Sequence, residues 1–203
     1  MRLKALAVAA LGLPVVLGAQ SADSLSLLGR SSINFGLGLT GHRSATLGFS
    51  GIGAKATGEI WSLGFSHWVH PEVAITIGVA MLGAQQTVGG GRLEANSVTP
   101  ILFGVSYSPR ALALASSLRP YVSLEAGPYL HSVSEVGPNL SASVETVPGM
   151  RSAIGANWFV ARHFMMSLEG DYHAIGHLNN IDAGSQPGGF GMSFALGVTW
   201  GGK

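Results

Sequence analysis

The chain has 203 residues, of which only 10% are charged and 30 are glycine, and its formal net charge is +1. The mean hydropathy of +0.38 indicates a membrane protein, yet no later run of about 18 apolar residues could form a spanning helix. The near-zero charge gives no electrostatic case for nucleic-acid binding. Cysteine is absent, which excludes disulfide bonds and a lipidated N-terminal cysteine.

The first residues are typical of a secretory signal peptide. Arg2 and Lys4 precede an apolar stretch at 5–17, and small residues follow it. A transmembrane anchor is the alternative, but the stretch is short for a spanning helix. We therefore expect residues 1–22 to hold the signal peptide and its cleavage region, and residues 23–203 to form a single domain.

The rest of the chain repeats one pattern, in which apolar side chains alternate with small or polar ones. Because a period of two places the two sets on opposite faces, each repeat predicts a β-strand. The first predicted strands cover 33–42, 58–69 and 73–81, and residues 70–72 form a tight turn around a proline. Residues 85–97, which contain the run GGGR, are expected to form a loop.

Two further strands are predicted at 98–108 and 121–133. A longer connection at 109–120 separates them and has room for a short helical turn. Residues 135–148 are rich in Gly, Pro and Ser, and we expect a second loop there.

The hairpin at 149–177 shows the alternation most clearly, with a short turn at 161–163. Its apolar face carries no charge over about ten residues, roughly the strand length that crosses a bilayer. A loop is expected at 179–189, and the last predicted strand covers 190–200.

The number of strands and the lengths of their connections predict the fold. The short turns at 70–72 and 161–163 contrast with long loops expected near 43–57, 86–97, 134–148 and 178–189. Because lipid offers no water to unpaired backbone groups, an apolar chain without spanning helices has to close its strands into a barrel. We predict an all-β fold, an eight-stranded antiparallel up-and-down transmembrane β-barrel.

The small residues indicate which face of the strands meets lipid. A soluble lipocalin-like barrel, the alternative, keeps its apolar face inward and carries many charged residues outside. The non-apolar face of the last strand instead consists of Gly191, Ser193, Ala195, Gly197 and Thr199. Such residues suit the narrow interior of a small barrel. Aromatic girdles are expected at the strand ends, formed by Trp61, Tyr107, Trp158, Tyr172 and Trp200.

Three stretches carry a resemblance to a known family: RPYVSLEAGPY at 119–129, MRSAIGANWFVARHFMMSLEGDY at 150–172 and FGMSFALGVTW at 190–200. In these stretches the chain resembles the small bacterial outer-membrane β-barrels of the OmpA/OmpX type. The resemblance implies a monomer in the bacterial outer membrane that contacts its lipid and lipopolysaccharide. It also implies insertion by the barrel-assembly machinery, which reads a terminal aromatic residue in this family. Here three residues follow Trp200.

Four charged residues share the inward face of three consecutive strands: Glu125, Arg151, Glu169 and Asp171. If Asn157 pairs with Met165 in the hairpin, Arg151 lies opposite Asp171. Because isolated charges are costly to desolvate, we expect these four to form an interior polar cluster. The cluster either blocks the lumen or lines a selective, gated passage.

Neither a metal site nor a catalytic site is expected. His173 and His177 would lie roughly 13 Å apart on a strand, too far to share one ion. A lipase would need a nucleophile, a histidine and a carboxylate within reach on the lipid side, and no outward Ser–His pair is evident. We predict a non-enzymatic protein without metal or cofactor. Its expected role is envelope-structural or surface interaction through its loops, the alternatives being a narrow passive channel and a lipid A-modifying enzyme.

Overall fold

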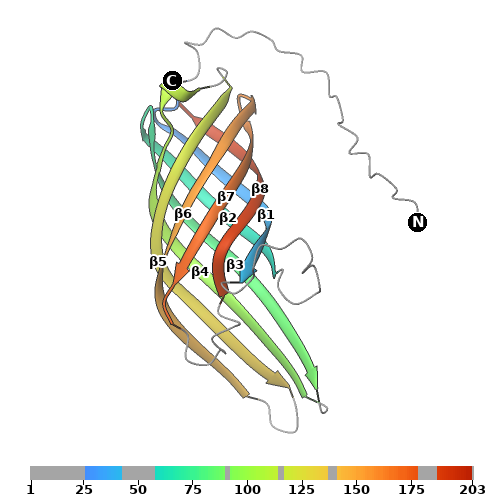
Figure 1. Cartoon of the computed structure of the whole chain (residues 1–203). Coiled ribbons are helices and arrows are strands. Elements are labelled where there is room, and N and C mark those ends of the chain that lie inside the picture. Colours follow the sequence, from blue (N-terminus) through green and yellow to red (C-terminus); the bar gives the residue numbers. More distant parts are fainter. Residues whose placement is uncertain are drawn as a thin grey trace, which may run out of the picture.

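The computed structural model describes residues 26–42, 58–89, 92–113, 117–136, 141–177 and 187–202. Within them, eight strands form a closed antiparallel barrel in which sequence neighbours pair and β1 also pairs with β8 (Figure 1). The strands are β1 (Arg30–His42), β2 (Gly58–His70), β3 (Val73–Gly89), β4 (Arg92–Tyr107), β5 (Leu118–Val136), β6 (Ser141–Ala161), β7 (Phe164–Ile175) and β8 (Pro187–Gly201). The predicted fold class is confirmed.

The only helix in the described part of the chain is a short 3₁₀ turn, η1 (Arg110–Leu112), in the connection where a helical turn was expected. No helix among the described residues is long and apolar enough to span a membrane. The expected signal region, the expected loop at 43–57 and most of the loop expected at 179–189 lie outside the described residues. The end of the last loop is wrong, because β8 begins at Pro187.

The loops predicted at 85–97 and 135–148 are wrong, because strands occupy most of both stretches. β3 continues to Gly89 and β4 begins at Arg92; β5 continues to Val136 and β6 begins at Ser141. A ladder beyond the bilayer needs backbone pairing but no uninterrupted apolar face. These stretches therefore form strands without the alternation by which the membrane-crossing parts were identified.

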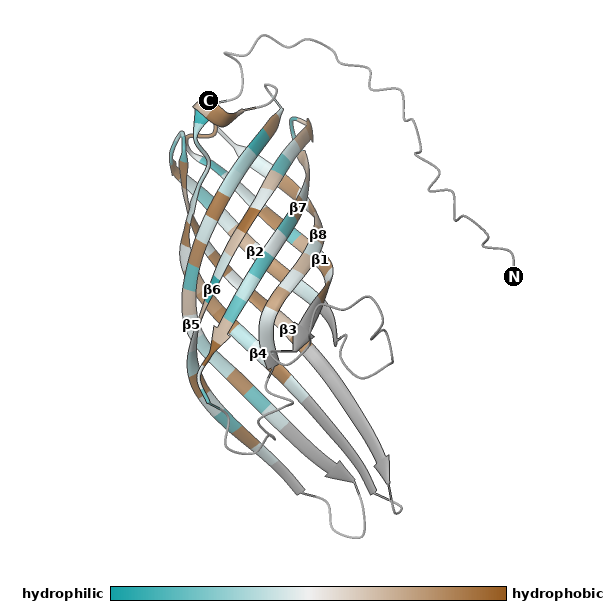
Figure 2. Ribbon diagram, viewed as in Figure 1, coloured by the Kyte–Doolittle hydropathy of each residue, from teal (hydrophilic) through white to brown (hydrophobic). Residues whose placement is uncertain are grey.

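The outward face of the barrel is apolar. Large hydrophobic side chains on every strand are exposed, among them Phe35, Leu63, Ile77, Phe103, Leu124, Ile154, Leu168 and Phe194. Figure 2 shows hydrophobic positions alternating with more polar ones along the strands. Four of the five expected girdle aromatics, Trp61, Tyr107, Trp158 and Trp200, are exposed, and the fifth, Tyr172, packs on Phe190.

Strands β3 to β6 extend beyond the other four strands as two long hairpins (Figure 1). The pairing of β2 with β3 ends at Trp61 and Met81, although β3 continues to Gly89. The pairing of β7 with β6 ends at Ile175 and Gly149, although β6 starts at Ser141. Beyond the barrel wall, β3 to β6 thus form a four-stranded sheet that we call the projecting sheet.

Candidate functional site: a sealed polar lumen

Arg151 on β6 lies at the centre of the lumen, and the structure brings all four predicted cluster residues together. Its Nη1 donates to Glu125 Oε2 at 2.8 Å, and its Nη2 donates to Asp171 Oδ2 at 3.1 Å. The same Nη2 also donates to Glu169 Oε1. Because β5, β6 and β7 are adjacent, a single guanidinium contacts carboxylates from both neighbouring strands.

The hairpin register differs from the expected one. Asn157 pairs with Ser167, and Arg151 pairs with His173, so the predicted pairings with Met165 and Asp171 are wrong. A register shift between Phe159 and Ala161, next to the tight turn at 162–163, offsets the two strands. Arg151 still contacts Asp171 because a long side chain can reach the diagonal neighbour on the next strand.

Tyr121 extends the cluster across β6. Its hydroxyl donates to Glu169 Oε2 at 2.6 Å, and the residue between them in the register is Gly155. A Cβ at Gly155 would lie 2.8 Å from Tyr121 Cζ. The missing side chain therefore lets the Tyr121 ring cross β6 and reach the carboxylate on β7.

Tyr129 repeats this arrangement further along β5. Its hydroxyl lies 2.9 Å from His173 Nδ1, and a Cβ at Gly149 would lie 2.4 Å from its ring. His173 Nε2 lies 3.7 Å from Asp171 Oδ2. The two tyrosines therefore join the ion pairs into one network of tyrosine, histidine, arginine and carboxylates.

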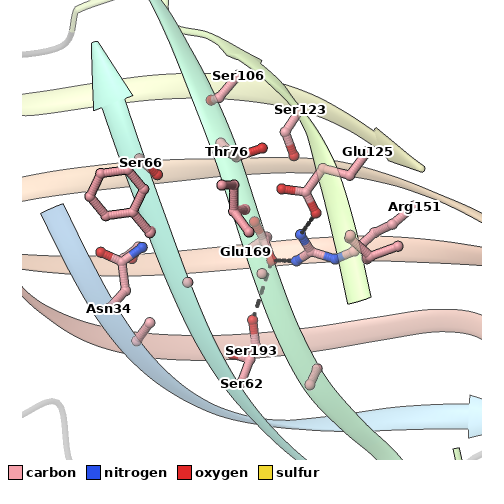
Figure 3. Close-up of a pocket in the computed structure, with 18 of the residues that line it drawn as sticks. Asn34, Ser62, Ser66, Thr76, Ser106, Ser123, Glu125, Arg151, Glu169 and Ser193 are labelled. Carbon is pink, nitrogen blue, oxygen red and sulfur yellow. Dashed lines mark hydrogen bonds and ion pairs between the residues drawn. The ribbon is translucent and has the colours of Figure 1, made fainter. Parts of the chain in front are cut away.

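The network borders a chamber of about 130 Å³ inside the barrel. Figure 3 shows Glu125 and Arg151 close together, Ser193 next to Glu169, and Asn34 and Ser66 away from Arg151. Small polar side chains make up much of the remaining wall. Those polar residues include Asn34, Ser62, Ser66, Thr76, Ser106, Ser123 and Ser193. The chamber wall is thus charged on β5 to β7 and formed mainly by neutral, small residues elsewhere.

Buried apolar layers lie at both ends of the chamber. The layer near the short turns consists of the buried residues Leu27, Trp68, Ala74, Phe159 and Met165. The layer near the projecting sheet consists of the buried residues Leu82, Val98, Leu102, Tyr129 and Val147. The side chains of both layers are almost inaccessible, so apolar residues narrow the lumen on both sides of the chamber.

Two buried arginines lie at the short-turn end of the lumen, beyond the apolar layer near the short turns. Arg30 on β1 and Arg119 on β5 both have inward positions. The Arg30 guanidinium carbon lies 5.8 Å from the centroid of the Phe159 ring. The lumen is therefore positively charged at this mouth and negatively charged in the chamber.

The sequence analysis did not identify Tyr121, Tyr129 and His173 as members of the network. It also did not predict either apolar layer. The alternation in the sequence assigns Tyr129 and His173 to the inward face, but it does not show how far along the barrel axis a side chain lies. The available signal was the presence of large inward residues such as Phe159 and Leu102 among small ones. In the described part of the chain, no three His, Asp or Glu side chains are arranged to hold a metal ion.

The fold and the lipid-facing exterior define a class of protein, the eight-stranded outer-membrane β-barrel. Solved structures of this class are similar to the chain throughout the barrel. Together these observations support localisation in the bacterial outer membrane.

Three solved structures illustrate the similarity. Neisserial surface protein A has 13% sequence identity and a TM-score of 0.57, with 84% of this chain and 95% of that chain covered. Ail, the attachment invasion locus protein of Yersinia pestis, has 10% identity and a TM-score of 0.55, with 85% and 99% covered. OprG from Pseudomonas aeruginosa has 14% identity and a TM-score of 0.53, with 86% and 97% covered. No protein-family profile and no curated protein sequence matches the chain.

Proposed function

We propose that this chain is an outer-membrane barrel with a sealed lumen and that its role, surface interaction, is carried by the projecting sheet. The observation that supports the proposal is that two buried apolar layers cross the lumen while β3 to β6 extend beyond the wall. In a barrel that does not conduct, the parts beyond the bilayer are available for contact with other molecules, and the projecting sheet is the largest described structure there.

The charge distribution in the lumen also argues against a channel. An anion entering past Arg30 and Arg119 would next meet the carboxylates of Glu125, Glu169 and Asp171. A cation would meet the two arginines first. Because both signs of charge encounter repulsion, and the apolar layers exclude water, neither kind of ion has a favourable path.

The projecting sheet has two edges without a neighbouring strand among the described residues. On β3 the edge covers 82–89, and on β6 it covers 141–147, because the Pro148 carbonyl already accepts from the Gly176 N–H. Unpaired N–H and C=O groups on a sheet edge can pair with an extended segment of another protein. The partner class that fits this geometry is an extended polypeptide at the cell surface. The names of Ail, an attachment invasion locus protein, and of Neisserial surface protein A are compatible with this proposal.

The proposal can be tested by trimming the hairpins without altering the barrel. Leu82 pairs with Val98, and His131 pairs with Glu145, so residues 83–97 and 132–144 can each be replaced by Asn-Gly. Such a dipeptide closes a two-residue hairpin. Bacteria displaying the parent should adhere more strongly to surfaces coated with extracellular-matrix proteins than bacteria displaying the trimmed barrel. Equal adherence at equal amounts of folded barrel would contradict the proposed role.

A further inference from the structure

The ion pairs around Arg151 leave the chamber with an excess of negative charge. Three carboxylates surround one guanidinium, and the only other basic side chain that lines the chamber is His173, whose Nε2 lies 3.7 Å from Asp171 Oδ2, so the carboxylates outnumber the basic groups. Asp171 is 6% exposed, and its Oδ1 has no hydrogen-bond partner among the described residues. An uncompensated buried charge is costly, so a further positive group is expected beside this network.

The chamber also contains oxygen atoms that have no hydrogen-bond partner among the described residues. Thr76 and Ser123 are 8% and 9% exposed, and neither hydroxyl has a hydrogen-bond partner among the described residues. The Asn34 amide oxygen also has none in the described part of the chain. All three residues line the chamber; Asn34 is on β1, Thr76 is on β3, and Ser123 is on β5 beside Glu125 (Figure 3). Buried polar atoms without a protein partner are normally satisfied by water or an ion.

We propose that the chamber binds an alkali-metal cation, Na⁺ or K⁺, together with water, between the carboxylates of β5 to β7 and the neutral oxygens of Asn34, Thr76 and Ser123. Carboxylate, hydroxyl and amide oxygens are ligands for hard cations. The chamber of about 130 Å³ has room for such an ion and several waters. The site is independent of the projecting sheet and of the proposed surface role.

A divalent ion fits the chamber less well. Mg²⁺ and Ca²⁺ sites rely on carboxylates that converge on the metal. Here Arg151 lies among the three carboxylates, and the described residues hold no set of three acidic or imidazole side chains arranged for a metal. A singly charged ion that keeps part of its water shell can bind with fewer direct charged ligands.

The sealed lumen predicts how the ion enters. Buried apolar side chains lie between the chamber and each mouth, so we expect the cation to be captured as the barrel folds and to exchange slowly afterwards. Binding to the folded state alone raises the free energy of unfolding. The folded protein should therefore retain the ion when the surrounding salt is replaced and release it on unfolding.

Elemental analysis tests retention directly. The full barrel is folded in NaCl or KCl and transferred into choline chloride, and its alkali-metal content is measured before and after heat unfolding. We expect one alkali ion per folded chain and none bound after unfolding. Absence of a stoichiometric ion from the folded protein, whichever salt is used, would overturn the proposal.

Two matched substitutions test the location. Glu125→Gln keeps an acceptor for Arg151 Nη1 but removes one charge, and we expect it to reduce retention at least about tenfold. Glu72→Gln makes the same change at the turn after β2, where the carboxylate accepts from the Arg110 backbone N–H, and it should retain the ion as the parent does. Equal retention by both variants would place any bound ion elsewhere and contradict the proposal.

Thr76→Val provides a test that does not alter charge. The parent should unfold at a higher urea concentration in NaCl than in choline chloride at equal ionic strength, and Thr76→Val should lose this difference. If the hydroxyl has no ligand, the substitution should leave stability unchanged or raise it equally in both salts. That outcome would contradict the proposal even if Glu125→Gln failed to fold.

Discussion

Glu125 and Arg151 lie directly opposite one another on β5 and β6, with 2.8 Å between Oε2 and Nη1. This cross-strand pair is the one ion pair of the network whose partners are register neighbours, because Glu169 and Asp171 contact the guanidinium diagonally. The position of Arg151 on the middle strand thus allows one side chain to join three strands inside the barrel.

Arg151→Ala should destabilise the barrel, because three carboxylates would remain buried without a cationic partner. Breaking a buried ion pair by removing one partner costs about 3–5 kcal/mol. Urea unfolding of the detergent-folded barrel measures this change. Arg151→Lys serves as the control, since it retains the charge but cannot make all of the guanidinium contacts, and its loss should be intermediate. If Arg151→Ala were as stable as the parent, the structural role of the network would be contradicted.

Gly155→Ala should also destabilise the barrel. The added Cβ would lie 2.6 Å from the Leu168 carbonyl oxygen and 2.8 Å from the Tyr121 hydroxyl oxygen, so the ring would have to leave Glu169. Overpacking of this kind costs about 1–3 kcal/mol. Gly64→Ala is a matched control on an inward position of β2, where the nearest atom would be Asn34 Nδ2 at 3.5 Å. Equal stability of the two variants would argue against the crossing of β6 by Tyr121.

Cysteines at two adjacent positions of β7 test the orientation of the wall. Leu168 is 52% exposed, whereas Ser167 is 8% exposed and faces the lumen. A lipid-soluble thiol reagent should label Leu168→Cys in folded vesicle-embedded barrel and leave Ser167→Cys largely unlabelled. After unfolding both should react. Preferential labelling of the cysteine at 167 would reverse the assigned faces.

Leu168→Arg should impair assembly through lipid exposure. Arginine on the lipid face near the midplane costs about 2–4 kcal/mol. Folding yield in vesicles, followed by the mobility difference between boiled and unboiled samples, measures the effect. The control is Arg162→Leu, at the turn before β7. This substitution should leave the folding yield near that of the parent. A parent-like yield for Leu168→Arg would contradict membrane burial of this face.

The sequence allowed the faces of the strands to be predicted but not the positions along them. Alternation placed Leu168 outside and Glu169 inside, because the period of two is a property of the backbone. The same reasoning brought Glu125, Arg151, Glu169 and Asp171 to a common interior, where the structure joins them. Register was mispredicted because the shift between Phe159 and Ala161 depends on the local geometry of the turn.

The layers that seal the lumen were not predicted for a related reason. Phe159, Trp68 and Met165 come from three strands, and their contact depends on the relative offset of all strands around the barrel. The projecting sheet was missed because its strands are identified by pairing and not by apolar alternation. In both cases the missing information is long-range pairing, which no single stretch of sequence contains.

Conductance in planar lipid bilayers tests the sealed lumen most directly. The purified parent should insert without producing steady current, because both apolar layers remain closed. The double variant Phe159→Ala with Leu102→Ala removes a large side chain from each layer and should conduct. The control Phe103→Ala, at an exposed position on β4, should produce no more current than the parent. A parent barrel that conducts steadily at low voltage would contradict the account.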